Sequence, residues 1–316
     1  MSQRIGTDVE VLSDPGDEPG LVDEWRALAE AAGNAFVTPE WYAAYAAHYG
    51  DDAPPFVIRV RDADGTLAGL LPLCRSGRTV RFAGANVGDR FGPVAAPGRE
   101  AEVARAAGGA LGREALVLHN VDAGASWVAA LGEGLRGRVA ATRLRGGVLP
   151  YVPLTGHTWD SFLGARSRNF RSQVRRKERA LVDGHGAVFR ATSAPDEVAA
   201  DVAAFFALHA ARWDGREGGS TITSPTVHAF HADFAAAALA RGWLRMSFLE
   251  IPAEIPGDAA ARGAVAALYG WRVGGRYAYF QAGFDPEWAA ASVGLVLMAH
   301  TVREAIAEGA DEYDLL

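Results

Sequence analysis

The sequence predicts an α+β fold built from two domains, each with a mixed, mostly antiparallel sheet flanked by helices. The chain has 316 residues, which is long for one compact core and favours two domains of roughly 150 residues. Glycine and proline cluster between Arg145 and Gly156, as they do at domain boundaries. Helical and strand-like patterns occur in both halves. We therefore expect domains at residues 1–150 and 151–316.

Composition narrows the class of protein. Hydrophobic residues make up 49% of the chain and charged residues 22%, the balance of an ordinary soluble globular protein. The net charge of −7 argues against a surface built throughout for nucleic acid, although a local basic patch can still bind polyanions. Cys74 is the only cysteine, which excludes an internal disulfide and favours a reducing compartment. No signal-peptide core or apolar run of roughly 20 residues is present. We expect a cytoplasmic monomer or homodimer without membrane insertion.

The first half reads as mixed helix and strand. A short helical pattern covers Trp25 to Ala32, and Thr38-Pro39 opens a second helix with an N-cap residue followed by proline. Two strand-like runs, Phe56–Arg61 and Thr66–Cys74, flank an Asp-Gly turn and form a hairpin. Further short strands are expected at Thr79–Gly84, Ala115–Asn120 and Arg138–Leu144. This half contains no concentration of catalytic residue types.

A dense charge run, RSRNFRSQVRRKER, opens the second half after a short helix at Trp159–Leu163. On a helix, Arg168, Arg171, Arg175 and Arg179 form one stripe, and Phe170, Val174 and Leu181 lie nearly opposite. The run is either a solvated helix face or a surface that contacts the phosphates of CoA, a nucleotide or tRNA.

Two more helices and three strands follow. The helices are expected from Glu197 to Trp213 and from Ser224-Pro225 onward, separated by a loop at Arg216–Thr223. On the second helix His228 and His231 lie three residues apart, but no acidic or thiol partner has metal-ligand spacing, so we interpret both as surface histidines and predict no metal. The strands are expected at Leu244–Ile251, Ala264–Trp271 and Arg276–Phe284, with a long loop from Pro252 to Gly263 between the first two.

The last 41 residues carry the strongest functional signal. In the strand Arg276–Phe284, a period of two places Tyr279 and Gln281 on one side, facing a cleft, and Phe280 and Ala282 on the other, under a helix. That helix begins at Ser292-Val293-Gly294 and ends at Gly309. Its first N–H groups and the positive end of its dipole form an anion site. The alternative is that Gly294 only permits a tight turn.

These segments together resemble the GNAT superfamily of CoA-dependent N-acyltransferases, and more closely its bacterial tandem branch, which is related to Fem-type aminoacyl transferases. The resemblance spans residues 35 to 316. It is carried by the following motifs: Thr38-Pro39-Glu40-Trp41, Asp64 to Leu73, Ser167 to Leu181, Leu208-His209 with Arg212-Trp213, Tyr279 to Pro286, and Ser292-Val293-Gly294-Leu295. Of the family's Gln/Arg-x-x-Gly-x-Gly/Ala loop, only Gly294 is present.

The resemblance implies an enzyme that moves an acyl group from acyl-CoA, acetyl-CoA in the first place, to the amine of a small or amino-acid-like substrate. It places the chemistry in the second domain and makes the first a degenerate partner. The donor is expected to contact Ser292, Val293, Gly294, Leu295, Phe280 and Ala282. Catalysis is expected from Asp285, which receives the amine, Tyr279, which protonates the leaving thiolate, and Gln281. The acceptor is expected to contact His209, Arg212, Trp213 and Arg168.

Two alternatives stay open. The arginine stripe favours aminoacyl-tRNA as the donor, as in Fem-type proteins. The missing loop glycine favours a GNAT-like binding module without catalysis, since a fold does not guarantee activity.

Overall fold

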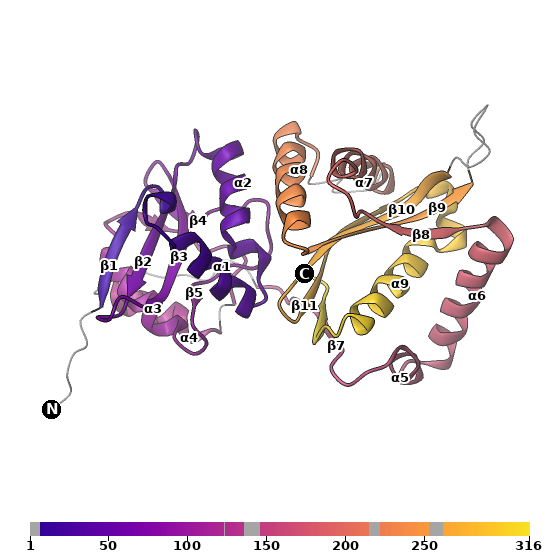
Figure 1. Ribbon diagram of the computed structural model, residues 1–316, viewed down its shortest axis with the longest axis horizontal. Coiled ribbons are helices and arrows are strands. Elements are labelled where there is room, and N and C mark those ends of the chain that lie inside the picture. The colour runs from indigo at the N-terminus through magenta and orange to yellow at the C-terminus, as the bar shows by residue number, and fades with distance from the viewer. Residues whose placement is uncertain (1–6, 123, 136–145, 215–221, 253–261) are drawn as a thin grey trace. The chain divides into compact units, whose positions relative to one another are not determined.

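The computed structural model describes residues 7–122, 124–135, 146–214, 222–252 and 262–316 (Figure 1). The chain divides into two compact units, residues 1–148 and 149–316. Each unit contains a six-stranded, mostly antiparallel sheet with helices against it, which confirms the predicted α+β class. The predicted strand at Arg138–Leu144 and most of the loops at Arg216–Thr223 and Pro252–Gly263 lie outside the described residues.

Unit 1 has the strand order β1-β2-β3-β4-β6, with β5 paired to β3. All pairs are antiparallel except β4 with β6. The strands are β1 (Asp8–Leu12), β2 (Pro55–Arg61), β3 (Leu67–Ser76), β4 (Thr79–Phe82), β5 (Val94–Ala95) and β6 (Ala115–Leu116). The predicted hairpin is therefore present, while the strand expected at Ala115–Asn120 is only two residues long.

The helices of unit 1 are α1 (Leu21–Ala31), α2 (Pro39–Tyr49), α3 (Glu100–Ala110) and α4 (Ser126–Gly134), with short 3-10 turns η1 (Pro15–Asp17) and η2 (Ala35–Val37). Thr38 caps α2 as predicted, because its hydroxyl accepts a hydrogen bond from Trp41 N at 3.2 Å. The aromatic face of α2 is buried, with Trp41 and Tyr45 fully inside. Sequence analysis did not predict α3 and α4, whose sequences are rich in alanine and glycine.

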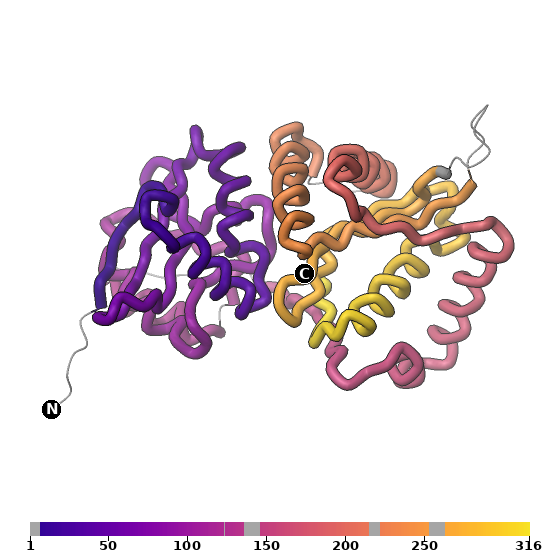
Figure 2. The backbone as a smooth tube through the Cα atoms, viewed as in Figure 1, coloured from indigo at the N-terminus to yellow at the C-terminus, as the bar shows by residue number. Residues whose placement is uncertain are grey.

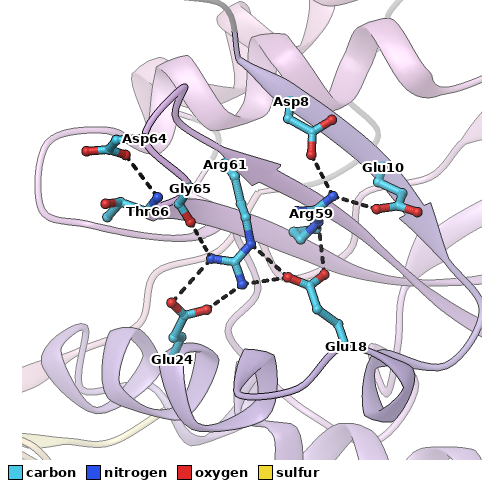
Figure 3. Close-up of polar contacts among 9 residues, drawn as sticks. All are labelled: Asp8, Glu10, Glu18, Glu24, Arg59, Arg61, Asp64, Gly65 and Thr66. Atoms are coloured by element: carbon cyan, nitrogen blue, oxygen red, sulfur yellow. Dashed lines mark hydrogen bonds and ion pairs between the residues drawn. The ribbon is translucent and has the colours of Figure 1, made fainter.

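A network of ion pairs joins β1, β2 and the first helices (Figure 3). Arg59 donates to Asp8 at 2.8 Å and to Glu10 at 2.5 Å. Arg61 contacts Glu18 at 2.6 Å and Glu24 at 2.5 Å. Each guanidinium thus meets more than one carboxylate, and the network ties the edge strand β1 to the sheet and to α1.

Unit 2 has the strand order β7-β12-β11-β10-β9-β8. Only β11 and β12 are parallel. The strands are β7 (Tyr151–Pro153), β8 (Val188–Ala191), β9 (Leu244–Pro252), β10 (Arg262–Val273), β11 (Arg276–Phe284) and β12 (Glu312–Asp314). The three predicted antiparallel strands are β9, β10 and β11, and the predicted bounds of β11 agree with the structure.

Helices cover both faces of this sheet. The helices are α5 (Trp159–Gly164), α6 (Arg168–His185), α7 (Val198–Trp213), α8 (Pro225–Ala240) and α9 (Val293–Ala307). One face packs against α7 and α8, through contacts such as Phe205 with Tyr269 and Phe234 with Trp271. The other packs against α9, with α6 beyond it, in a core that includes Leu181, Leu268 and Leu297 (Figure 1). The tube in Figure 2 follows the chain from β11 through α9 back to β12.

A β-bulge in β11 changes which residues face which helices. The register with β10 pairs Gln281 with Tyr269 and Tyr279 with Gly270, so Phe280 is the extra residue. Phe280 then points to the α7–α8 face, where it contacts His231, Tyr269 and Trp271. Tyr279 instead packs in the core beneath α9. The predicted alternation is wrong here because a bulge breaks the period of two.

His231 is not a surface histidine, in contrast to our interpretation. Its side chain is completely buried among aromatic rings, edge-on to Phe230 at 5.0 Å and to Tyr269 at 5.6 Å between centroids. Burial lowers its pKa to about 3. The described residues contain no group of three or more His, Cys, Asp or Glu placed to hold a metal ion. Across the same residues, no helix is long and apolar enough to span a membrane.

Candidate functional site

The free edge of β11 is the centre of the candidate site. β12 pairs only with Arg276, Tyr277 and Ala278, and among the described strands none continues the pairing along Tyr279–Phe284. Asp285 N donates to Val265 O at 3.0 Å. The alternation of an antiparallel ladder therefore directs the backbone N–H and C=O groups of Ala282 and Phe284 away from β10. This edge presents polar backbone groups to a ligand.

Helix α7 comes very close to this edge. A Cβ atom at Gly283 would lie 2.2 Å from His209 N and 2.4 Å from Leu208 C, so only glycine permits the approach. His209, Arg212 and Trp213 follow at helical spacing of three and four residues and share one side of α7. The three residues predicted to contact the acceptor from this helix are thus brought to β11.

His209 forms a side-chain hydrogen bond with Gln281. The histidine is only 3% exposed. Burial, the larger effect, lowers its pKa, and the positive charge of Arg212 acts in the same direction, while the bond to Gln281 opposes them. The imidazole is therefore neutral near pH 7, the form that can accept a proton.

Arg212 closes part of the edge. Its Nη1 donates to Ala282 O at 2.9 Å, which agrees with the outward direction of that carbonyl. Its guanidinium carbon lies 5.4 Å from the centre of the Trp213 ring and 5.5 Å from that of Phe284, within cation–π range. Two aromatic rings therefore lie within cation–π range of the arginine at the strand edge.

The N-terminus of α9 lies beside the same edge. The amides of Val293, Gly294 and Leu295 have no hydrogen-bond acceptor among the described residues, and no side chain caps the helix. A Cβ atom at Gly294 would lie 3.6 Å from Phe284 Cδ1, so the residue that stacks on Arg212 also borders the helix start. The left-handed residue of this turn is Ser292, with φ of 62°, and not Gly294.

The predicted catalytic residues do not converge. Tyr279 lies under α9 and Gln281 faces α7, on opposite faces of the sheet. Asp285 ends β11 and its Oδ1 accepts a hydrogen bond from Glu287 N at 3.0 Å, which caps η3 (Pro286–Ala291). Of the two residues predicted under the helix, Ala282 pairs with Leu268 on the α9 face, whereas Phe280 is in the α7–α8 core.

Two basic residues of α6, Arg168 and Lys177, differ in what surrounds them. Arg168 is exposed at the start of a helix on the α9 side of the sheet, so the structure separates it from Arg212 on α7. Lys177, which sequence analysis did not single out, donates from Nζ to Ala290 O at 2.5 Å, just before α9. No pattern in the sequence links Lys177 to Ala290, because the two residues are 113 positions apart.

The chain is similar to a known protein family and to several solved structures. Residues 168–316 match the family model described as acetyltransferase (GNAT) domain. No curated protein matches the sequence. The solved structure of FemX is 11% identical, covers 93% of this chain and 86% of its own, and has a TM-score of 0.64. That of L-PGS from Bacillus licheniformis is 12% identical, covers 94% and 75%, and has a TM-score of 0.51. A tandem GNAT protein from the clavulanic acid biosynthesis pathway is 15% identical, covers 98% and 90%, and has a TM-score of 0.46. At these identities, the likeness to FemX and L-PGS is one of fold.

Proposed function

From the match of residues 168–316 to the acetyltransferase (GNAT) domain family, we propose that the chain is a cytoplasmic N-acyltransferase. It moves an acyl group from acyl-CoA, acetyl-CoA in the first place, to the amine of a small or amino-acid-like acceptor. The observation that supports this most is the uncapped N-terminus of α9 beside the free edge of β11. The chemistry belongs to unit 2, and unit 1 is a partner without a reaction of its own.

The phosphates and amides of acyl-CoA can bind to the start of α9 and to the free edge of β11. Phosphates are bound by the amides of Val293, Gly294 and Leu295, helped by the helix dipole and by the Ser292 hydroxyl. The amide-containing arm of CoA is extended and can hydrogen-bond along the outward groups of Ala282 and Phe284. This places the thioester near Gln281 and the α7 residues, while Phe280 is buried in the α7–α8 core and has no part in donor binding.

Acyl transfer then requires two proton movements. The amine nitrogen forms a bond with the thioester carbonyl carbon, the carbon–sulfur bond breaks, the amine loses a proton and the thiolate gains one. We assign the amine proton to Asp285, whose Oδ1 is held by Glu287 N, or to the neutral His209 that Gln281 orients. Tyr279, which the sequence predicts as the proton donor to the thiolate, lies on the opposite face of the sheet from Gln281. Arg212 and Trp213 form the wall of the acceptor pocket.

Replacing Gly294 by alanine is expected to weaken acetyl-CoA binding at least tenfold without lowering the melting temperature. The added methyl group has ordinary contact with Phe284, and Gly294 has no left-handed backbone, so folding tolerates it. It crowds the amides that receive the phosphate. Isothermal titration of the full chain with acetyl-CoA measures the effect.

The matched control is Gly132→Ala in α4, where no atom lies within 4 Å of the new Cβ and binding should equal that of the wild type. Equal affinity of Gly294→Ala and wild type would remove α9 as the donor site. No binding of acetyl-CoA or longer acyl-CoAs to the wild type would overturn the CoA-dependent function. Binding of aminoacyl-tRNA in its place would identify the alternative donor, and binding of neither would favour a module without catalysis.

A further inference from the structure

The outer face of α6 concentrates positive charge in an acidic protein. Residues 166–179 contain six arginines, one lysine and one glutamate, a net charge of +6. The whole chain carries −7, which leaves −13 for the remaining residues. Arg168, Arg175, Arg176 and Arg179 are all exposed, and we call these four residues the basic face. The rest of the protein thus repels polyanions, and the basic face attracts them.

The four arginines of the basic face lack the carboxylate partners that most other described arginines have. None of its four side chains has a hydrogen bond or ion pair with any residue that the structure describes. Carboxylates pair with arginines throughout both units, at Arg26, Arg59, Arg61, Arg99, Arg105, Arg190, Arg245, Arg276 and Arg303. A cluster of like charges costs free energy unless a ligand of opposite charge is bound.

The helix that carries the basic face is firmly attached. Val174 and Leu181 are buried on its inner side. Glu178 forms an ion pair with Arg303 of α9 at 3.0 Å, and Lys177 binds Ala290 O. Arg171, between the exposed arginines, donates to the carbonyls of Gly164 and Arg166 and fixes the connection to α5. The guanidinium groups therefore project from a rigid scaffold, which lowers the entropy lost on binding.

We propose that the basic face binds the phosphodiester backbone of a nucleic acid. Arg168, Arg175 and Arg179 follow one line that is about 16 Å long at 1.5 Å per residue, enough for several successive phosphates. Arg175 and Arg176 are neighbours in sequence and so point about 100° apart around the helix. The phosphates that line a nucleic-acid groove can contact arginines on both of these sides of the helix. A flat lipid surface contacts only the one side of the helix that lies against it.

This proposal concerns the exposed side of α6, whereas the donor of the proposed function binds at the N-terminus of α9. Phosphate contacts carry no sequence information, so binding needs neither an acyl donor nor a particular base sequence. RNA and DNA share the backbone chemistry, and the experiment distinguishes them.

Fluorescence anisotropy of the full chain with a labelled 24-nucleotide RNA hairpin and a labelled 24-base-pair DNA duplex tests the proposal. Four phosphate contacts give a slope of about −3.6 for log K against log salt, or roughly a hundredfold loss between 50 and 200 mM salt. The variant R168Q/R175Q/R176Q/R179Q is expected to bind at least tenfold more weakly with a nearly flat salt dependence. Its affinity for acetyl-CoA should be unchanged.

The control variant is R75Q/R78Q/R105Q/R113Q, which removes the same charge from exposed arginines of unit 1 and should bind like the wild type. Equal binding by the basic-face variant and the wild type, or an equal loss in the control, would overturn the proposal. So would binding of vesicles with 30% phosphatidylglycerol when neither nucleic acid binds. Circular dichroism of both variants establishes that α6 is still folded.

Discussion

Replacing Gly283 by alanine is expected to lower the free energy of unfolding by about 3 kcal/mol and to separate α7 from β11. The new Cβ would meet two backbone atoms of α7, at 2.2 and 2.4 Å, and backbone cannot move aside as a flexible side chain can. The helix must shift, which breaks the hydrogen bond between His209 and Gln281. Urea unfolding followed by circular dichroism measures the loss of stability.

The control is Gly184→Ala in the last turn of α6, where the added Cβ has no neighbour within 4 Å. Removing a helical glycine at such a site should raise stability by about 0.5–1 kcal/mol. If the two variants had the same stability, the close contact between α7 and β11 would be wrong, and with it the position of His209.

Replacing His231 by leucine is expected to make the protein markedly more resistant to acid. The pKa of His231 is about 3 in the folded state and about 6.5 when unfolded, so between these values the unfolded chain binds more protons. The contribution of His231 to the free energy of unfolding is complete above pH 6.5. It decreases as the pH falls toward 3, by about 5 kcal/mol in total. Burial is the larger cause of the lowered pKa, and the charge of His228 acts in the same direction.

The measurement is urea unfolding of the wild type and His231→Leu at pH 7, 6, 5 and 4. Leucine has a similar volume and does not titrate, so near pH 7 the two proteins should differ by about 1 kcal/mol or less. Below pH 6, the wild type should lose up to about 1.4 kcal/mol more per pH unit. His185→Gln, at an exposed position in the same unit, should follow the wild type. Parallel curves for wild type and His231→Leu would contradict a neutral buried imidazole.

The elements that sequence predicted well have local causes. The start of α2 follows from the hydroxyl of Thr38 and the ring of Pro39, and the hairpin of β2 and β3 from the turn that ends in Gly65. The whole of β11 lies between a glycine turn and Asp285-Pro286, so its bounds can be read from the chain. The N-terminus of α9 follows in the same way, since the apolar period begins at Val293.

The elements that sequence missed depend on distant parts of the chain. The bulge at Phe280 is a property of the register between two strands and leaves no mark on the alternation of β11 alone. The need for glycine at position 283 comes from α7, and the burial of His231 comes from rings on α7, β10 and β11. For the candidate site, sequence therefore predicted the helix start and the α7 residues but not the separation of Tyr279 from Gln281.

The bond between Lys177 and Ala290 gives this protein a built-in reporter. Lys177 is the only lysine of the chain, so it is the only residue with an ε-amine. Its nitrogen is held at the connection between α6 and the turn that leads into α9. A reagent that modifies lysine therefore samples one defined place in the fold. The rate of its reaction measures how often that connection opens, and a ligand that tightens the start of α9 should slow it.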